Sequence, residues 1–192
     1  MKTTDTKIII MKQPPVLKTE RLILSLPTLV DVPKIVEYAG NEKIAATTQN
    51  LPHPYQEKDA IFWLNMANQG FQNQDKHIFG LHLKSTKEFI GGMGLHVNQA
   101  YERAVLGYWV AFPFWNKGYA TEALAAVLKF GFEVVQLNKI YAVHLVENPA
   151  SGKVMIKNGM IKEGELKEHT KKGDQYRSVI QYRLTRKEYS EL

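Results

Sequence analysis

The stretch "WNKGYATEAL", residues 115–124, joins an apolar strand pattern to a long helical pattern. Gly118 lies just before that helix, where glycine is well tolerated. In the interior of the helix, glycine would lower its stability. The first N–H groups of a helix have no intrahelical partner and attract anions such as phosphate. Lys117 adds a positive charge, and Ala120 is the next small residue. The stretch is therefore a candidate pyrophosphate cradle, although a plain turn that needs one glycine explains the same pattern.

The chain on either side of this turn predicts a strand–helix–strand unit. Residues 104–111, "AVLGYWVA", are almost wholly apolar and indicate a central strand. From residue 121, apolar side chains recur at helical spacing over about four turns. Residues 139–146, "KIYAVHLV", indicate a second buried strand. Two strands joined by a helix of this length pair in parallel, and ligands then sit at their C-terminal ends.

The remaining patterns complete a mixed α/β sheet. Helices are predicted at residues 28–40, with Asp31 as N-cap, at 56–68 and at 148–159, where Asn148 is the N-cap and Gly159 the stop. Further strands are predicted at residues 20–27, 76–84, 88–97, 161–170 and 176–184. The expected order is βααβββαβαββ, a mostly antiparallel sheet with one parallel pair, flanked by helices.

Length and composition fit one domain. The chain has 192 residues and 44% hydrophobic residues. We expect residues 1–15 to be a flexible leader or an edge strand, and residues 16–192 to be a single domain. No apolar run is long enough to span a membrane. Cysteine is absent, which excludes a disulfide scaffold, a thiol nucleophile and a cysteine-ligated metal, and fits a cytoplasmic protein.

The charge is basic but diffuse. Lys and Arg number 25 against 19 Asp and Glu, a formal charge of +6. Such an excess fits an ordinary soluble surface or an anionic partner. The chain has no zinc-ligand spacing, no aromatic RNA-binding strand and no dense arginine face, so we expect no direct nucleic-acid readout.

The glycine stretch resembles motif A of the GNAT superfamily of N-acetyltransferases, Q/R-x-x-G-x-G/A. A tryptophan at the first position of this motif, here Trp115, resembles the variant found in the RimJ/RimL-type branch, the ribosomal-protein N-terminal acetyltransferases. Four other stretches resemble that branch in the same order along the chain: "LKTERLILSL" (residues 17–26), "LPHPY" (51–55), "LGYW" (106–109), and Asn148, Ser151, Lys157 and Gly159 in the last helix. Together they cover about residues 16–184.

The resemblance implies a GNAT fold with acetyl-CoA as co-substrate and no metal. The pyrophosphate would bind the N–H groups of residues 116–120, and the pantetheine arm would lie along residues 109–112 like an added strand. A backbone N–H near Val110 would polarise the acetyl carbonyl, an oxyanion-hole role. The residues that it assigns to the cofactor are Trp109, Val110, Ala111, Phe112, Trp115, Asn116, Lys117, Gly118, Tyr119, Ala120, Thr121, Asn148 and Ser151.

The resemblance also indicates catalytic candidates. Many GNAT enzymes carry a tyrosine acid at the place of Met155, and methionine cannot donate a proton. Ser151, one turn earlier, is the substitute that the RimJ/RimL-type pattern suggests, although it also suits first-turn hydrogen bonding. Asn148 is expected to be the N-cap and, as the resemblance implies, also a catalytic candidate and a cofactor contact.

The general base is open. Related chains often carry a glutamate where this chain has Val105. The remaining candidates are Glu102 and His96, followed by His53 and His144, and each of them is also an ordinary strand or loop residue.

The resulting expectation is an acetyl-CoA-dependent N-acetyltransferase in which a primary amine attacks the thioester directly in a ternary complex. The acceptor would be a protein N-terminus, such as that of a ribosomal protein, or a small amine. The missing glutamate and tyrosine motivate an alternative, a catalytically weak acyl-CoA-binding module. Many relatives pair, so a homodimer is also expected.

Overall fold

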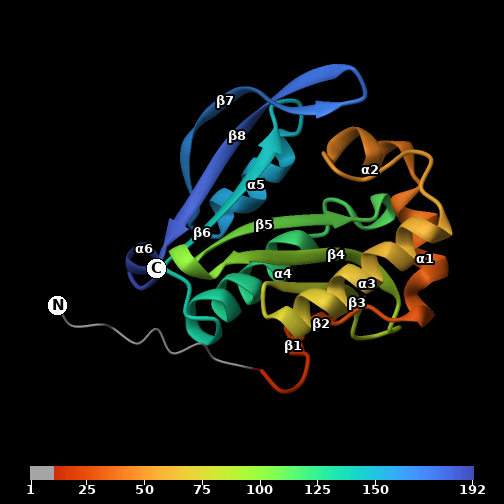
Figure 1. The fold of residues 1–192 in the computed structure, drawn as a ribbon, viewed down its shortest axis with the longest axis horizontal. Helices are drawn as coiled ribbons and strands as arrows, with labels where there is room; N and C mark the ends of the chain where they lie inside the picture. The colour runs from red at the N-terminus through yellow and green to blue at the C-terminus, as the bar shows by residue number, and fades with distance from the viewer. Residues whose placement is uncertain (1–10) are drawn as a thin grey trace.

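An eight-stranded sheet organises residues 11–192, the part of the chain that the computed structural model describes (Figure 1). The predicted leader, residues 1–15, falls mostly outside this part. The strands lie in the order β1-β2-β3-β4-β5-β6-β8-β7. Their bounds are Leu17–Lys18 for β1, Leu22–Ser25 for β2, Lys76–Leu83 for β3, Phe89–Asn98 for β4, Arg103–Val110 for β5, Lys139–Leu145 for β6, Ile161–Lys172 for β7 and Gln175–Thr185 for β8.

Helices flank both faces of the sheet. Those of the N-terminal half are α1 (Val32–Ala39), α2 (Glu42–Thr47) and α3 (Glu57–Asn73). Those of the C-terminal half are α4 (Tyr119–Lys129), α5 (Pro149–Lys157) and α6 (Arg186–Tyr189). Short 3₁₀ turns precede α1 at Leu29–Asp31, follow β4 at Gln99–Tyr101 and follow β5 at Phe112–Phe114. A π-helical turn, Phe130–Val134, extends α4.

Strands β5 and β6 form the parallel pair that the sequence predicts, and every other neighbouring pair is antiparallel. Their pairing runs only from Arg103 opposite Lys139 to Leu106 opposite Ala142. Beyond that point β5 continues to Val110 and β6 to Leu145 without pairing to each other. Figure 1 shows the two strands parting toward their C-terminal ends.

The core has two parts because each face of the sheet buries its own helices. On one face, Leu124 and Val127 of α4 pack with strand residues such as Leu95 and Leu106. On the other face, α1 and α3 pack over Phe89. Successive side chains along a strand point to opposite faces of the sheet, so β4 and β5 contribute residues to the hydrophobic clusters on both faces.

Several details differ from the sequence expectation. Helices α2 and α6 and the short strand β1 were not predicted, because each is too short to show a clear period. Asp31 was predicted to cap α1, but its side chain makes no cap hydrogen bond. It instead accepts a hydrogen bond from the Thr28 N–H at 2.8 Å and lies 2.9 Å from His82 Nε2.

No helix within residues 11–192 combines the length and the apolar character needed to cross a bilayer.

Candidate active site

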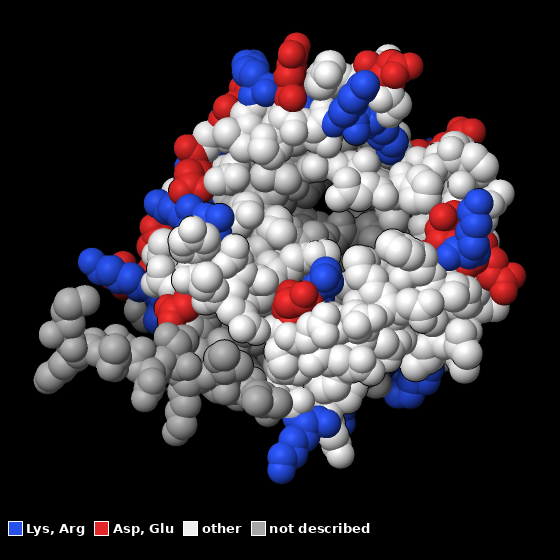
Figure 2. Space-filling model, viewed as in Figure 1, with Lys and Arg blue, Asp and Glu red and all other residues white. Residues whose placement is uncertain are grey.

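The gap between β5 and β6 exposes one edge of β5. The Ala111 N–H donates to Ile90 O of β4 at 2.8 Å. In an antiparallel ladder the hydrogen-bonding direction alternates from residue to residue, so the peptide groups of Tyr108 and Val110 point away from β4. Because the pairing with β6 stops at Leu106, these groups face the opening. A space-filling view shows the surface hollowed between α5 and β5 (Figure 2).

The turn at Gly118 leads directly from this opening into α4. Gly118 has φ 80° and ψ 0°, the left-handed conformation, and is the N-cap residue of α4. Asn116, two residues earlier, is also left-handed, with φ 59°. Such turns direct successive N–H groups to one side and form anion-binding concavities. A Cβ at Gly118 would meet only Arg21 Nη2, at 3.4 Å, so the backbone here is open to a ligand.

Trp115 ties the turn to β5. Its indole Nε1 donates to the Val110 carbonyl oxygen at 2.5 Å. Its ring packs edge-on against Phe112, with ring centroids 5.3 Å apart. The two ends of the predicted cofactor stretch, the strand end and the glycine turn, are thereby held together.

A charged cluster that the sequence analysis did not find holds the start of α4 to the start of the sheet. Glu122 accepts hydrogen bonds from Thr19 Oγ1 at 2.5 Å, from the Arg21 N–H at 2.7 Å and from Arg21 Nε at 2.7 Å. Arg21 also donates from Nη1 to the Lys117 carbonyl oxygen at 3.0 Å and lies over the Tyr119 ring. We call Thr19, Arg21 and Glu122 the α4 clamp. The "TER" of residues 19–21 was noticed as a resemblance, but only the fold brings it to Glu122.

The clamp shifts the ionisation of Glu122. Burial alone would raise the pKa of this carboxyl, but the hydrogen bonds from Thr19 and from the Arg21 backbone and guanidinium outweigh it and lower the pKa. The carboxylate is therefore charged at neutral pH, and it offsets the guanidinium beside the glycine turn.

Helix α5 borders the opening from the other side. Asn148 is its N-cap, as predicted, and its side chain accepts a hydrogen bond from the Ser151 N–H at 3.4 Å. The Tyr108 hydroxyl lies 2.8 Å from Ser151 Oγ and 3.0 Å from the Ser151 carbonyl oxygen. Burial raises the pKa of Tyr108 to about 12, and the hydrogen bond with Ser151 opposes that rise. The pair connects β5 to α5 across the opening.

Helix α2 lies at the same end of the molecule and is bonded to the C-terminal half. Asn148 Nδ2 donates to the Thr47 carbonyl oxygen at 3.2 Å. Lys172 Nζ of β7 donates to the carbonyl oxygens of Ala45 and Thr48. These bonds hold α2 against β7 and against the N-cap of α5, the helix that borders the opening.

The structure places two of the four candidate bases, Glu102 and His96, away from this site. Glu102 precedes β5 and His96 pairs with Val105, so both lie toward the N-terminal end of β5, whereas the opening lies at its C-terminal end. His53 is exposed in the loop before α3. His144 is buried under α5, with Nδ1 2.7 Å from the Leu145 carbonyl oxygen. This placement disfavours Glu102 and His96 as the base.

The side chains of two other residues singled out in the sequence, Trp109 and Met155, are packed against the hydrophobic core. The Trp109 side chain belongs to the face of the sheet that α1 and α3 cover, with its ring 5.8 Å from that of Phe89, so it lies on the face opposite to that of Tyr108. Met155, at the place of the usual tyrosine, is buried in the core. Among residues 11–192, no group of three or more His, Asp or Glu side chains is arranged to hold a metal ion.

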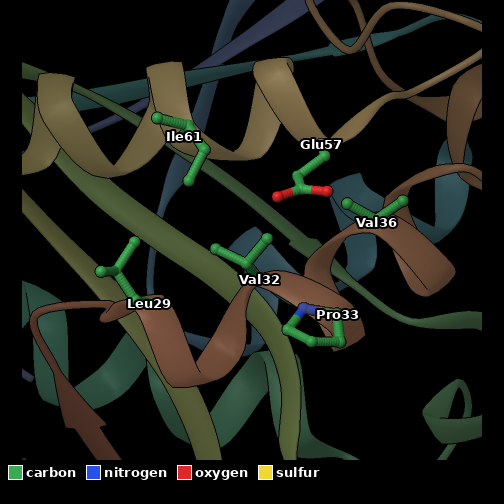
Figure 3. A pocket seen from close by; sticks show the side chains of 6 residues that line it. All are labelled: Leu29, Val32, Pro33, Val36, Glu57 and Ile61. Atoms are coloured by element: carbon green, nitrogen blue, oxygen red, sulfur yellow. The ribbon is translucent and has the colours of Figure 1, made fainter.

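A separate pocket lies between α1 and α3. Its volume is about 450 Å³, and it is lined by Leu29, Val32, Pro33, Val36, Glu57 and Ile61. Figure 3 shows these side chains facing one another, with Glu57 as the one charged group. Its lining has no glycine turn and no free strand edge, and it places the Glu57 carboxylate at the start of α3, so it is the poorer match to a nucleotide ligand.

Comparison with known proteins agrees with this geometry. Residues 21–161 match the family model of the acetyltransferase (GNAT) domain. The chain is 31% identical over 156 residues to the uncharacterized N-acetyltransferase YoaA of Bacillus subtilis, covering 81% of this chain and 88% of that protein. It is 25% identical over 179 residues to the ribosomal protein uS5-alanine N-acetyltransferase of Escherichia coli, covering 88% and 90%.

Solved structures share the fold. A GNAT-family acetyltransferase from Bacillus anthracis superposes with a TM-score of 0.78 at 25% identity, covering 90% of this chain and 99% of that one. RimJ of Mycobacterium smegmatis, in complex with CoA disulfide, superposes with a TM-score of 0.83 at 22% identity, covering 91% and 89%. The predicted fold is therefore confirmed. Family model, relatives and fold agree: the chain is a GNAT acetyltransferase, an acetyl-CoA-dependent enzyme whose relatives include ribosomal-protein N-acetyltransferases.

Proposed function

We propose that the protein transfers the acetyl group of acetyl-CoA to the primary amine at a protein or peptide N-terminus, by direct attack within a ternary complex. The observation that carries this proposal is the unpaired edge of β5, where the peptide groups of Tyr108 and Val110 face an opening that leads to the Gly118 turn. A strand edge and a helix N-terminus suit the two halves of the cofactor, an amide-containing arm and a pyrophosphate.

The residues present suit distinct roles in binding. The N–H groups of Asn116 through Ala120 would bind the pyrophosphate, and the pantetheine arm would run along residues 109–112, pairing with the peptide groups of β5 that face the opening. Tyr119 and Thr121 belong to the first turn of α4, which begins directly after Gly118. The Val110 N–H would donate to the acetyl oxygen as negative charge develops there, which is an oxyanion-hole role.

The chemistry requires few protein groups. The amine nitrogen bonds to the acetyl carbon, the C–S bond breaks with its electron pair going to sulfur, and the amine proton is lost to water or to a base. Ser151 lies beside the strand edge and would donate a hydrogen bond to the leaving sulfur. Holding the amine and the thioester together supplies much of the rate enhancement, which explains why no strongly basic side chain is needed at the site.

The acceptor is inferred from the charges around the mouth. Lys172 holds the C-terminal end of α2, and Arg177 of β8 lies 3.5 Å from Glu147, which immediately precedes Asn148. The β7–β8 hairpin, residues 161–185, carries six Lys and Arg against four Asp and Glu, and Figure 2 shows both kinds of side chain over it beside the hollow. These cations disfavour a polycationic amine more than a peptide with a single N-terminal charge. The homodimer remains a prediction of the family resemblance, and the cytoplasmic location remains a prediction from the cysteine-free composition.

The test is release of free thiol from acetyl-CoA over a panel of amines. The panel holds peptides with different N-terminal residues, free amino acids, spermidine and an aminoglycoside, and mass spectrometry locates the added acetyl group. We expect release with one set of peptides and acetylation of their α-amine. Efficient release with spermidine instead would overturn the proposed acceptor, and tight acetyl-CoA binding without release on any amine would support the binding-module alternative.

The indole of Trp115 offers a separate prediction about cofactor binding. Phenylalanine at this position keeps the ring contact with Phe112 but loses the hydrogen bond to the Val110 carbonyl. One such bond contributes about 1 kcal/mol, so we expect Trp115→Phe to raise the Kd for acetyl-CoA by about fivefold. Calorimetric titration measures this. Trp63→Phe in α3, on the opposite face of the sheet, is the matched control and should leave the Kd unchanged, whereas equal effects of both changes would contradict the role of Trp115.

A further inference from the structure

The Arg21 guanidinium is held from both sides of the glycine turn. Its Nε donates to Glu122 Oε2 at 2.7 Å, and its Nη1 donates to the Lys117 carbonyl oxygen at 3.0 Å. Lys117 immediately precedes Gly118, and Glu122 follows it in the first turn of α4. The central carbon of the guanidinium, Cζ, also lies 4.6 Å from the centre of the Tyr119 ring. These contacts fix both the position and the plane of the guanidinium beside the turn.

The third nitrogen of this guanidinium, Nη2, faces the turn. Arginine has five N–H groups, and two of them are on Nη2. Among residues 11–192, the structure gives Nη2 no hydrogen-bond acceptor, since the bonds of this guanidinium are made by Nε and Nη1. Nη2 is instead the atom that a Cβ at Gly118 would meet, at 3.4 Å. It therefore borders the space that the missing side chain of Gly118 leaves open, and 44% of the Arg21 side chain is exposed to solvent.

Arg21 is better placed for an anion at this turn than Lys117, the cation that precedes Gly118 in the sequence. Lys117 carries its charge on a flexible stem, with Nζ 5.3 Å from the centre of the Phe114 ring. Ordering such a side chain around an anion costs rotamer entropy. The Arg21 guanidinium is ordered beforehand by its two hydrogen bonds, and its planar set of N–H groups suits phosphoryl oxygens.

We propose that Arg21 is a cofactor-binding residue, whose Nη2 donates hydrogen bonds to a phosphoryl oxygen of the CoA pyrophosphate. This inference rests on the proposed function, which places the pyrophosphate on the N–H groups of residues 116–120. The α4 clamp then does more than fasten α4 to the sheet, because it also presents a guanidinium to the anion. Since Glu122 offsets the charge of Arg21, the contact acts through directed hydrogen bonds more than through long-range attraction.

Side-chain replacements separate a direct contact from the support that the clamp gives to the turn. Arg21→Met keeps an apolar stem and removes every donor, so it should raise the Kd for CoA more than Glu122→Gln does. The deciding comparison is made in the Glu122→Gln background, where the clamp is already broken. A direct contact predicts that Arg21→Met raises the Kd about fivefold further there, measured by calorimetric titration. A role through the clamp alone predicts no further change.

Ligands that lack single groups locate the contact on the cofactor. Dephospho-CoA lacks the 3′-phosphate of CoA but keeps the pyrophosphate, so Arg21→Met should weaken the binding of both ligands by the same factor. Loss of the effect with dephospho-CoA would place Arg21 at the 3′-phosphate and overturn the inference.

Chemical modification gives a readout on the unaltered protein. Phenylglyoxal reacts with exposed guanidinium groups, and mass spectrometry of the peptides measures its addition to Arg21. Bound dephospho-CoA should protect Arg21, whereas acetyl-pantetheine, which has no phosphate, should not. Modification at an unchanged rate with dephospho-CoA bound would contradict the inference.

Arg103→Met is the matched control. Arg103 also lies over a tyrosine ring, 5.0 Å from the centre of that of Tyr101, but it stands at the start of β5. The same loss of charge there should leave the Kd for CoA unchanged. Equal Kd values for Glu122→Gln and the double variant would overturn the inference and leave the proposed function intact. Failure of the wild-type protein to bind CoA would instead refute the proposed function. Thermal melting checks that each variant is folded.

Discussion

Replacement of Gly118 by glutamate is expected to abolish acetyl-CoA binding while the protein stays folded. Gly118 is left-handed at the first turn of α4, and its missing side chain leaves the backbone open to an anion. Glutamate places bulk and a negative charge where the pyrophosphate would lie. It also offers Arg21 a second carboxylate partner. We expect a loss of at least a hundredfold in affinity, about 3 kcal/mol, measured by calorimetric titration.

Gly118→Ala is the control for conformation. A left-handed alanine costs about 1–2 kcal/mol of folding stability, and glutamate carries the same cost. Alanine adds no charge, so its effect on affinity should be much smaller than that of glutamate, while the two variants lose similar stability in thermal melts. Equal acetyl-CoA affinity in wild type and Gly118→Glu would show that the turn does not hold the pyrophosphate.

Glu122→Gln is expected to weaken both folding and cofactor binding. Glutamine keeps the shape of the side chain but presents an N–H₂ group to the N–H donors of Arg21. Hydrogen bonds to charged groups contribute about 1.5–3 kcal/mol, and we expect a loss of about 2 kcal/mol of unfolding free energy at neutral pH. Because the clamp fixes the first turn of α4 and the Lys117 carbonyl, we also expect the Kd for acetyl-CoA to rise about tenfold.

Glu163→Gln separates the two effects. Glu163 of β7 accepts hydrogen bonds from Lys139 at 2.7 Å and Gln181 at 2.6 Å, and it lies in none of the elements around the glycine turn. It should lose stability in chemical denaturation without any change in acetyl-CoA affinity. An affinity loss as large as that of Glu122→Gln would mean that the α4 clamp has no special connection to the cofactor.

The clamp also has a pH signature. The pKa of Glu122 is lowered in the folded protein, so its contribution to stability is present above the pKa of the unfolded state and is lost as the pH falls through the folded pKa. Denaturation titrations from neutral pH into the acid range should show the wild type losing its advantage over Glu122→Gln. A stability difference that stays constant over this range would contradict the assigned ionisation.

The sheet could be predicted from the sequence wherever burial on both faces produced long apolar runs. Strands β5 and β6 are of this kind. Helix α4 showed a clear helical period between them, and this strand–helix–strand order predicted the parallel pair. Helix α2 could not be predicted, because six residues give less than two turns of periodicity. The π-helical turn after α4 could not be distinguished from the helix in the sequence, because it continues the same helical pattern of apolar residues.

The candidate site was predictable where it depends on local backbone geometry. Gly118 and Asn148 act through turns and caps, which neighbouring residues determine, and both occur in the structure as expected. Contacts between distant segments were not predictable in this way. The α4 clamp joins residues about a hundred positions apart, and Tyr108 meets Ser151 only because β5 and α5 border the same opening. The base candidates were proposed by residue type alone, and the register of β4 and β5 moves Glu102 and His96 away from the site.

The most direct test of the account is a crystal structure of the protein with acetyl-CoA. We expect the pyrophosphate on the N–H groups of residues 116–120, the pantetheine arm paired with β5 between Tyr108 and Val110, and the sulfur within hydrogen-bond distance of Ser151 Oγ. Density for the cofactor in the pocket between α1 and α3, with the β5–β6 opening filled only by water, would contradict it.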